Sequence, residues 1–256
     1  ALRKDVVIGT RFWGKKPEDI HILRGFVVNA WHYRPAKILV AVNVDKDLCG
    51  VAQAVESGTL EEMMSIDTGG ILEAFPVSPW GRFVQPLNAL VLKAAQEGAS
   101  YLLLASAEVK LSPEIIASLL EEMKDEHVLV AGAALPGHNF EERFIYGYGD
   151  TVPWNTLALW RLKYLANIGF SLVGDAPAEP EMAGIEELAT MAVCGAVYPH
   201  LRAVLKQVPG VEFDTNGWDE ARLSAHFEKI RSKKNRAEWQ LAQLDLPRPI
   251  VIHKAV

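Results

Sequence analysis

The chain has 256 residues, which is enough for one large domain or two small ones. Half of the residues are hydrophobic and 23% are charged, a balance that is typical of a globular protein and excludes an intrinsically disordered one. The net charge of −6 gives no general attraction to nucleic acid or to anionic lipid, so a negatively charged ligand would have to be held by local basic groups.

The cysteines and the apolar runs narrow the class of protein further. Cys49 and Cys194 lie far apart with no Cys-x-x-Cys spacing, which argues against a structural zinc site and for reduced thiols in the cytosol. No apolar run in the sequence approaches the roughly 18 residues of a membrane span. We expect a cytoplasmic protein, or one that is at most peripheral to a membrane, with no nucleic-acid partner.

The first half of the chain alternates between strand and helix patterns. Runs that are apolar almost throughout predict buried strands, and stretches with helical spacing lie between them. Ser112 followed by Pro113 is typical of a helix start, with a capping hydroxyl and a proline at the first helical position. The predicted strands cover residues 5–10, 37–44, 72–77, 100–106 and 127–135, and the predicted helices cover residues 17–33, 84–98 and 112–126, with a loop and a short helix over 45–58.

The second half is richer in aromatic residues and is broken by Gly and Pro. Here the predicted elements are a helix from about Pro153 to Asn167, a loop over 174–184, a helix over 184–198 and basic helices over 213–244. Apolar strands separated by helices predict a mostly parallel sheet with helices on both faces, which is a doubly wound αβα sandwich of the α/β class. The sequence contains no linker or repeat, so we expect one domain.

Polar residues follow the predicted strands, and open α/β sheets bind ligands at the carboxyl ends of their strands. These residues offer hydrogen bonds for a base and ribose, cations for phosphates and one hard oxygen ligand, which suits a nucleoside diphosphate. Asn43 and Asp45 are predicted to hold the base and ribose, and Arg11 and Arg82 the phosphates. The full set is Thr10 and Arg11 after the first strand, Asn43, Asp45 and Asp47 after the second, Ser106 and Glu108 after the fourth, and Gly81 and Arg82 ahead of the helix at 84–98.

A resemblance to a known family covers most of the chain and is best over residues 76–192. Residues 80–120 read WGRFVQPLNALVLKAAQEGASYLLLASAEVKLSPEIIASLL, which is similar to inverting family 2 glycosyltransferases of the GT-A fold. The shared order is a Gly-containing loop, a helix with an internal Asn, a hydrophobic strand, an acidic turn and Leu-x-Pro ahead of a helix. The resemblance implies transfer of a sugar from a nucleotide-sugar donor to an acceptor hydroxyl, with the donor on residues 1–135 and the acceptor on residues 136–256.

The acidic turn departs from the family pattern. The family has Asp-x-Asp, whose second Asp contacts the divalent ion that bridges the diphosphate, and this chain has Ser-Ala-Glu at residues 106–108. The resemblance implies Glu108 as a ligand of Mg²⁺ or Mn²⁺ and His226 as a late second ligand, with Arg231 and Lys233 close to the phosphates. Because Mg²⁺ keeps several waters beside substrate phosphates, one carboxylate can suffice. The presence and the absence of a metal both stay open.

A second motif, AGIEELATMA at residues 183–192, begins a helix with two acidic residues. The family carries an acidic pair here, and one member is the general base that deprotonates the acceptor hydroxyl, which is otherwise a poor nucleophile. The resemblance implies Glu187 as the base with Glu186 beside it. It also implies that Trp154 and Asn155 contact the acceptor. The alternative is that the two acids only favour the helix dipole.

Two other functions stay open. The stretch IGTRFWGKKP at residues 8–17 partly matches the Gly-x-Gly-Thr-Arg loop of nucleotidyltransferases, but Val7 stands where the first Gly should be and Lys and Pro come in reverse order. The other is a catalytically inactive, glycosyltransferase-like binding protein, which Ser106 favours and the pair Glu186 and Glu187 opposes. The sequence has no P-loop, no Gly-x-Ser-x-Gly elbow and no Gly-x-Gly-x-x-Gly after a strand.

Overall fold

A computed structural model of the protein describes residues 5–46, 50–215 and 218–256. Cys49, and Asp47 of the predicted ligand-binding set, lie outside the described residues. The strands are β1 (Val6–Phe12), β2 (Lys37–Asn43), β3 (Leu72–Val77), β4 (Tyr101–Ala105), β5 (Val109–Lys110), β6 (Val128–Ala133), β7 (Phe144–Tyr146), β8 (Leu157–Arg161), β9 (Arg202–Lys206), β10 (Glu212–Phe213) and β11 (Ile250–Lys254). The α-helices are α1 (Asp19–His32), α2 (Val51–Ser57), α3 (Leu60–Met64), α4 (Val84–Gln96), α5 (Pro113–Glu122), α6 (Leu162–Ile168), α7 (Glu186–Val197), α8 (Glu220–Arg231) and α9 (Lys233–Leu244).

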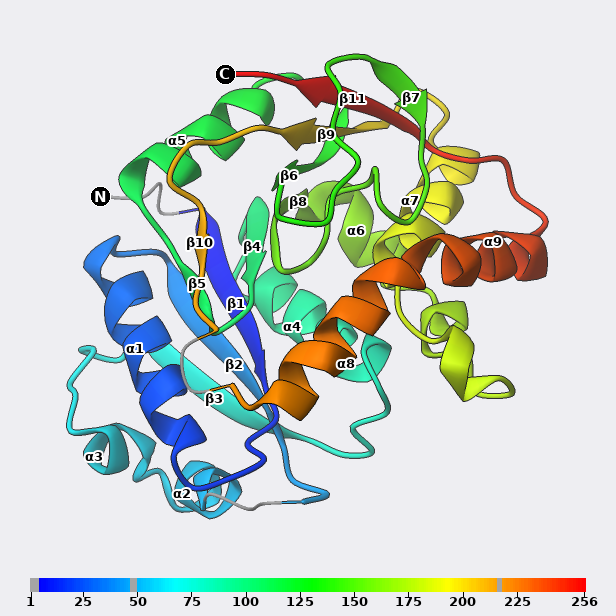
Figure 1. Ribbon diagram of the computed structural model, residues 1–256. Coiled ribbons are helices and arrows are strands. Elements are labelled where there is room, and N and C mark those ends of the chain that lie inside the picture. Colours follow the sequence, from blue (N-terminus) through cyan, green and yellow to red (C-terminus); the bar gives the residue numbers. More distant parts are fainter. Residues whose placement is uncertain (1–4, 47–49, 216–217) are drawn as a thin grey trace.

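Within the described residues, nine strands form one sheet in the order β3-β2-β1-β4-β8-β6-β9-β11-β7 (Figure 1). Strands β3, β2, β1 and β4 are parallel, as are β6, β9 and β11, whereas β8 and β7 are antiparallel to their neighbours. The predicted αβα architecture with a mostly parallel sheet is confirmed. The chain passes from β1 to β2 and β3 on one side and then to β4 on the other, and open α/β sheets bind ligands where the winding reverses in this way.

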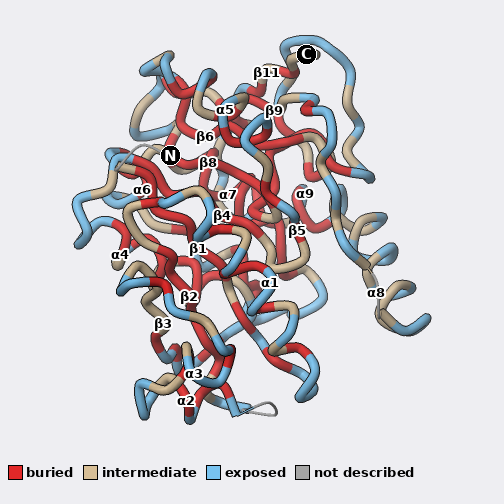
Figure 2. Tube along the Cα trace, turned by 90° about the vertical axis from the view of Figure 1, so that its left-hand side faces the viewer, coloured by how far each residue is buried: buried red, intermediate tan, exposed pale blue. Residues whose placement is uncertain are grey.

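Helices cover both faces of the sheet (Figure 1). One apolar core lies between the sheet and α1, α3 and α5, and it includes Ile8 of β1 and Leu23 of α1. The other core lies between the sheet and α4, α6 and α7, and it includes Val7 of β1 and Leu90 of α4. Val7 and Ile8 enter different cores because consecutive strand residues point to opposite faces. Figure 2 shows the buried residues along the central strands, with the exposed ones on the outer helices and loops.

The helix predicted from about Pro153 to Asn167 is wrong in its first half. Residues Leu157–Arg161 form β8, which pairs antiparallel with both β4 and β6, and α6 begins only at Leu162. A strand that is buried on both faces is apolar at nearly every position, so its spacing also satisfies a helical pattern. Because β8 is antiparallel to β4, its first residues lie at the carboxyl end of β4, where the Ser106 N–H donates to the Thr156 carbonyl at 2.9 Å.

Strands β7, β9 and β11 are also not predicted from the sequence. Strands β9 and β11 are five-residue runs with a lysine at their ends, and β7 is a three-residue partner of β11, so each gives a weak pattern. The helices predicted near the end of the chain are confirmed as α7, α8 and α9. In the part of the chain that the structure describes, no helix combines the length and the apolar character needed to cross a membrane.

Candidate active site

Two adjoining cavities lie at the carboxyl edge of the sheet, at the point where the winding reverses. The inner cavity has a volume of about 240 Å³ and the outer cavity about 1030 Å³. We call their shared lining the junction, and it consists of Arg11, Phe83, Ser106, Glu108, Arg222, Lys229 and Arg236. Of the other predicted residues, Trp154, Asn155, Glu186, Glu187 and His226 line the inner cavity, and Gly81 and Arg82 line the outer one with Trp13 and Trp80.

The end of β1 supplies two of the predicted ligand-binding residues. The strand continues to Phe12, past its predicted end, so Thr10 and Arg11 belong to it and point to opposite sides. Thr10 is buried, its Oγ1 has no hydrogen-bond partner among the described residues, and it lines a small cavity of about 80 Å³ that reaches Ser106. The Arg11 guanidinium lies 5.4 Å from the centre of the Phe83 ring. The end of β1 therefore brings one cation to the junction and one buried hydroxyl beside it.

The predicted metal ligand Glu108 has an arginine as its partner. Its Oε1 accepts a hydrogen bond from Arg222 Nη2 at 2.8 Å, and its Oε2 accepts one from the Ser106 hydroxyl. The Arg222 guanidinium lies 4.1 Å from the centre of the Trp218 ring, a cation–π contact that helps to fix its position. Both carboxylate oxygens of Glu108 are therefore engaged by protein groups.

The second predicted metal ligand, His226, lies among aromatic rings. It stacks on Phe213 with a centroid distance of 5.5 Å and meets Trp218 edge-on at 5.3 Å, and burial lowers its pKa. Within residues 5–46, 50–215 and 218–256, no group of three or more His, Cys, Asp or Glu side chains is arranged to hold a metal ion. A carboxylate already paired with arginine and a packed imidazole fit a divalent ion poorly, because Mg²⁺ and Ca²⁺ prefer several oxygen ligands.

Glu186 and Glu187 begin helix α7 and are both buried, with exposed fractions of 3% and 5%. The backbone N–H of Asn155 donates to Glu187 Oε1 at 2.6 Å, and its amide nitrogen lies 3.3 Å from Glu186 Oε1. Trp160 Nε1 donates to Asn155 Oδ1 at 2.9 Å, which fixes the orientation of the amide. Asn155 therefore orients both carboxylates, and its own polar groups are directed at the protein.

The environment of Glu187 favours its protonated form. Burial, followed by the negative charge of Glu186, raises the pKa of Glu187 to about 7. Lys233 acts in the opposite direction, but burial also lowers the pKa of the Lys233 ammonium group. A carboxyl group that titrates near neutral pH in a cavity is well suited to take up and release a proton.

Trp154, predicted to stack on an acceptor sugar, offers little of its ring to a ligand. It is 4% exposed, it stacks on His138 with a centroid distance of 3.6 Å, and Lys233 Nζ lies 3.5 Å from the centre of its ring. Its Nε1 donates to the Gly149 carbonyl at 2.9 Å. Trp154 thus supports Lys233 at the wall of the inner cavity.

Helices α8 and α9 bring further cations to the cavities. Lys229 Nζ lies 4.9 Å from the centre of the Phe83 ring, and Arg236 donates to the Ala183 carbonyl at 2.6 Å and to the Lys229 carbonyl. Gly184 makes this packing possible, because its φ is +102° and a Cβ there would lie 2.3 Å from Arg236 Nη1. The loop ahead of α7 therefore needs glycine at this position for Arg236 to reach the junction.

The loop that leads into α4 is held by a carboxylate from the second half of the chain. Asp175, at the end of the short helix η1 (Leu172–Asp175), accepts hydrogen bonds from the backbone N–H groups of Arg82, Phe83 and Val84 at 3.1, 2.7 and 2.9 Å. Such N–H groups at a helix start have no partner inside the helix. Gly81 has φ +64°, and a Cβ there would lie 2.7 Å from Asp175 Oδ2. Asp175 therefore shapes one wall of the outer cavity.

Three residues that the sequence analysis names lie away from the junction. Asn43 and Asp45 line neither the inner nor the outer cavity. Asn43 Oδ1 accepts a hydrogen bond from the Asp45 N–H at 2.9 Å, and Asp45 Oδ2 accepts one from the Trp80 N–H at 2.8 Å. Both residues therefore shape the turn beside Trp80, which lines the outer cavity. Arg231 is exposed and lines neither cavity.

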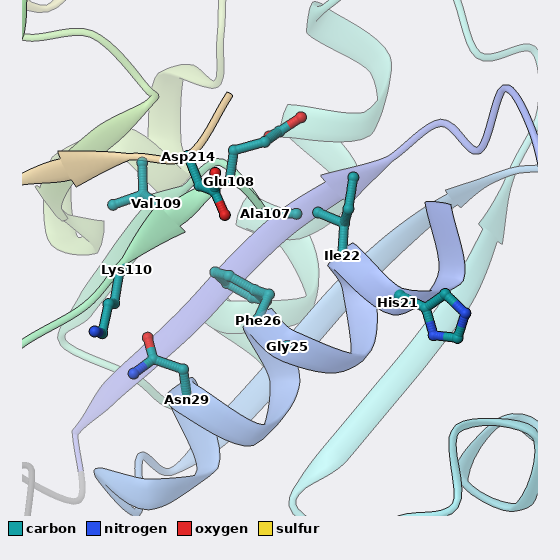
Figure 3. Close-up of a pocket in the computed structure, with 10 residues that line it drawn as sticks. All are labelled: His21, Ile22, Gly25, Phe26, Asn29, Ala107, Glu108, Val109, Lys110 and Asp214. Carbon is teal, nitrogen blue, oxygen red and sulfur yellow. The ribbon is translucent and has the colours of Figure 1, made fainter. Parts of the chain in front are cut away.

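A third cavity, of about 430 Å³, lies on the other side of the acidic turn, between α1 and the two-stranded antiparallel sheet of β5 and β10 (Figure 3). Phe26 and Asn29 of α1 line it, and the Glu108 carboxylate is directed away from them (Figure 3). The Asn29 amide exchanges hydrogen bonds with the Leu111 backbone at 3.2 and 2.8 Å. This cavity adjoins the acidic turn, and its Asn29 side chain holds the chain that follows β5.

Arg222, Lys229 and Arg236 are not predicted from the sequence, unlike His226, Arg231 and Lys233, although the sequence carries a signal for them. Residues 222, 226, 229, 233 and 236 are separated by four, three, four and three positions, a spacing that places them on one face of a helix. Only Ser232 separates α8 from α9. This face turns toward the cavities and carries Arg222, His226, Lys229, Lys233 and Arg236.

No protein-family model and no curated protein matches this chain. Its structure is similar to that of a mannosyltransferase from Pyrobaculum calidifontis in complex with GDP-mannose and Mn²⁺, with a TM-score of 0.63 and 14% identity over 97% of this chain and 66% of that one. It is also similar to glucosyl-3-phosphoglycerate synthase from Mycobacterium tuberculosis in complex with phosphoglyceric acid, with a TM-score of 0.52 and 9% identity over 95% of this chain and 81% of that one. The chain spans about two thirds of the length of the mannosyltransferase. At these identities the likeness shows the fold, and the chain has the GT-A-like fold that its sequence resemblance implies.

Proposed function

We propose that this protein is a glycosyltransferase that moves a sugar from a nucleotide-sugar donor to an acceptor hydroxyl with inversion. The observation that carries the proposal is the junction, where adjoining cavities bring cations from β1, α8 and α9 close to the buried pair of Glu186 and Glu187. A nucleotide sugar has its diphosphate between the nucleoside and the sugar. The outer cavity, the junction and the inner cavity match these three parts in order.

In this proposal the nucleoside occupies the outer cavity between Trp13, Trp80 and Arg82. Arg82 Nη1 donates to the Pro180 carbonyl at 2.9 Å, which holds its side chain at the cavity wall. Asn43 and Asp45, which the sequence predicts as direct ligands, act by fixing the turn that carries Trp80. The two similar proteins were solved with GDP-mannose and with UDP, so donors of both bases are the first to test.

Glu187 is the general base in this proposal. The acceptor oxygen forms a bond to the anomeric carbon of the donor sugar while the bond from that carbon to the diphosphate oxygen breaks. The proton of the acceptor hydroxyl passes to the Glu187 carboxylate, and the nucleoside diphosphate leaves. Asn155 and Glu186 hold and tune Glu187, and the cations of the junction stabilise the negative charge that grows on the leaving diphosphate.

Binding of a divalent cation stays a prediction from the sequence resemblance. Structures of both similar proteins contain Mn²⁺. In this chain the predicted ligands Glu108 and His226 are engaged by Arg222 and by aromatic rings, and they do not fit a metal site. No step of the proposed reaction is therefore assigned to a metal ion.

A catalytically inactive binding protein is the second candidate, and the Glu108–Arg222 pair is the observation that favours it. The test incubates the protein with GDP-mannose, UDP-glucose and UDP-N-acetylglucosamine, together with a panel of carbohydrate acceptors, and measures the released nucleoside diphosphate. Release supports the glycosyltransferase. Binding without release supports the inactive protein, and release of pyrophosphate from a nucleoside triphosphate would indicate a nucleotidyltransferase instead.

A further inference from the structure

Positively charged side chains outnumber negatively charged ones at the junction. Its four cationic side chains are those of Arg11, Arg222, Lys229 and Arg236, and its one carboxylate is that of Glu108. We propose that these four cations bind the diphosphate of the donor directly, so that this protein needs no divalent cation to bind its donor or to stabilise the leaving group. This inference rests on the proposed function and specifies how its donor site is built.

Three of the four cations have no carboxylate partner among the described residues. Arg236 is held by the carbonyls of Ala183 and Lys229, and its buried Nε has no hydrogen-bond partner in the described part of the chain. Arg11 and Lys229 both contact the Phe83 ring. Burial, followed by the charges of Arg236 and Arg11, lowers the pKa of Lys229, and the negative charge of Glu186 offsets this only in part. An anion bound here would relieve this repulsion.

The fourth cation, Arg222, forms an ion pair with Glu108 of the acidic turn. Its guanidinium contacts Glu108 Oε1 at 2.8 Å and is fixed by the Trp218 ring. In the family that the sequence resembles, the acid at this position contacts the divalent ion. A metal bound to Glu108 here would have to displace Arg222. A guanidinium still has further N–H donors for phosphate oxygens when one of them binds a carboxylate.

The test measures binding of inorganic pyrophosphate, UDP and GDP by isothermal titration calorimetry, once in EDTA and once in MnCl₂. We expect binding in EDTA, with an affinity within about threefold of that in Mn²⁺, because fixed cations already supply the charge. Arg222→Gln and Lys229→Gln should each weaken pyrophosphate binding by about tenfold. Arg231→Gln, which removes the same charge from the exposed side of α8, should leave it unchanged. Arg222→Lys, which keeps the charge, should bind more tightly than Arg222→Gln.

Glu108→Gln separates the two roles of the acidic turn most sharply. If Glu108 only pairs with Arg222, its neutralisation removes the one negative charge of the junction and pyrophosphate binds more tightly in EDTA. If Glu108 holds a metal, the same substitution weakens binding in MnCl₂. Circular dichroism of each variant checks that it is folded.

The outcomes distinguish this inference from the proposed function. Nucleotides that bind only in MnCl₂ would overturn the inference and leave the glycosyltransferase proposal intact. Pyrophosphate that binds in EDTA, with no sugar transferred from any donor, would support the inference and count against the enzyme. If pyrophosphate and both nucleotides fail to bind in either condition, both proposals are wrong.

Discussion

The backbone N–H of Asn155 donates a hydrogen bond to Glu187 Oε1 at 2.6 Å, although the two residues are 32 positions apart. The contact depends on β8 running antiparallel to β4, which places the residues ahead of β8 at the carboxyl edge of the sheet. It also depends on α7 beginning with its acids at the same edge. The pair joins the sheet to the helix that carries the proposed base.

The first prediction concerns the pH dependence of the proposed reaction. Glu187 must be ionised to take a proton, so kcat/KM should rise with pH through a pKa of about 7. Asn155→Asp keeps the oxygen that accepts from Trp160 but places a second negative charge beside Glu186. We therefore expect the pKa seen in the kcat/KM profile to rise by about one unit. Initial rates over a pH series measure both. An unchanged pKa of the kcat/KM profile in Asn155→Asp would contradict the assignment of this pKa to the glutamate pair.

The second prediction concerns stability. The pKa of Glu187 is raised from an ordinary value near 4.5 to about 7, so below 4.5 it is protonated in the folded and the unfolded chain alike. As the pH rises toward 7, the unfolded chain loses this proton first, and the free energy of unfolding falls. Glu187→Gln cannot ionise, so its melting temperature relative to the unsubstituted protein should be higher at about pH 8 than at about pH 5. A difference that stays constant between these pH values would refute the raised pKa.

The third prediction concerns the loop ahead of α4. Asp175→Asn replaces a carboxylate that accepts three backbone hydrogen bonds, and we expect a loss of about 2 kcal/mol in the free energy of unfolding and weaker nucleotide binding. Asp219→Asn is the matched control, because Asp219 is the exposed N-cap of α8 and Asn caps helices as well as Asp does. Denaturant unfolding measures both variants. Equal losses would show that Asp175 has no special role.

The fourth prediction concerns Gly184. An alanine there would have an unfavourable positive φ, and its Cβ would meet Arg236, so Gly184→Ala should cost more than about 1 kcal/mol of stability and reduce pyrophosphate binding. Gly195→Ala is the control, since a Cβ at Gly195 meets nothing within 4 Å and alanine favours a helix by about 0.5–1 kcal/mol. If Gly184→Ala binds pyrophosphate as well as the control does, Arg236 is not positioned by this loop.

The alternating half of the fold could be predicted from the sequence, and the rest could not, for physical reasons. Strands β1, β2 and β4 are short apolar runs between polar turns, so their positions are clear. The strand at Leu157–Arg161 is buried on both faces and leads directly into α6, and no polar position shows where the strand ends. Strands β9 and β11 each end in a lysine, which similarly shortens the apolar run that would reveal the strand.

The site was predictable where a local pattern marks it. Arg11 lies near the end of β1, Ser106 follows β4 and Glu187 lies in the first turn of α7, and all three line the inner cavity. The pairing of Glu108 with Arg222 joins residues 114 positions apart, and no local pattern shows it. Asp175 was missed for the same reason, because its partners are the N–H groups of a helix about ninety residues earlier.

The role of Glu187 as the general base is tested by comparing the unsubstituted protein with Glu187→Gln in an assay of nucleoside diphosphate release from GDP-mannose, UDP-glucose and UDP-N-acetylglucosamine with carbohydrate acceptors. We expect release by the unsubstituted protein from at least one donor. In Glu187→Gln we expect release to be slower by at least about a hundredfold, with donor binding retained. Equal release by both proteins would show that Glu187 is not the base.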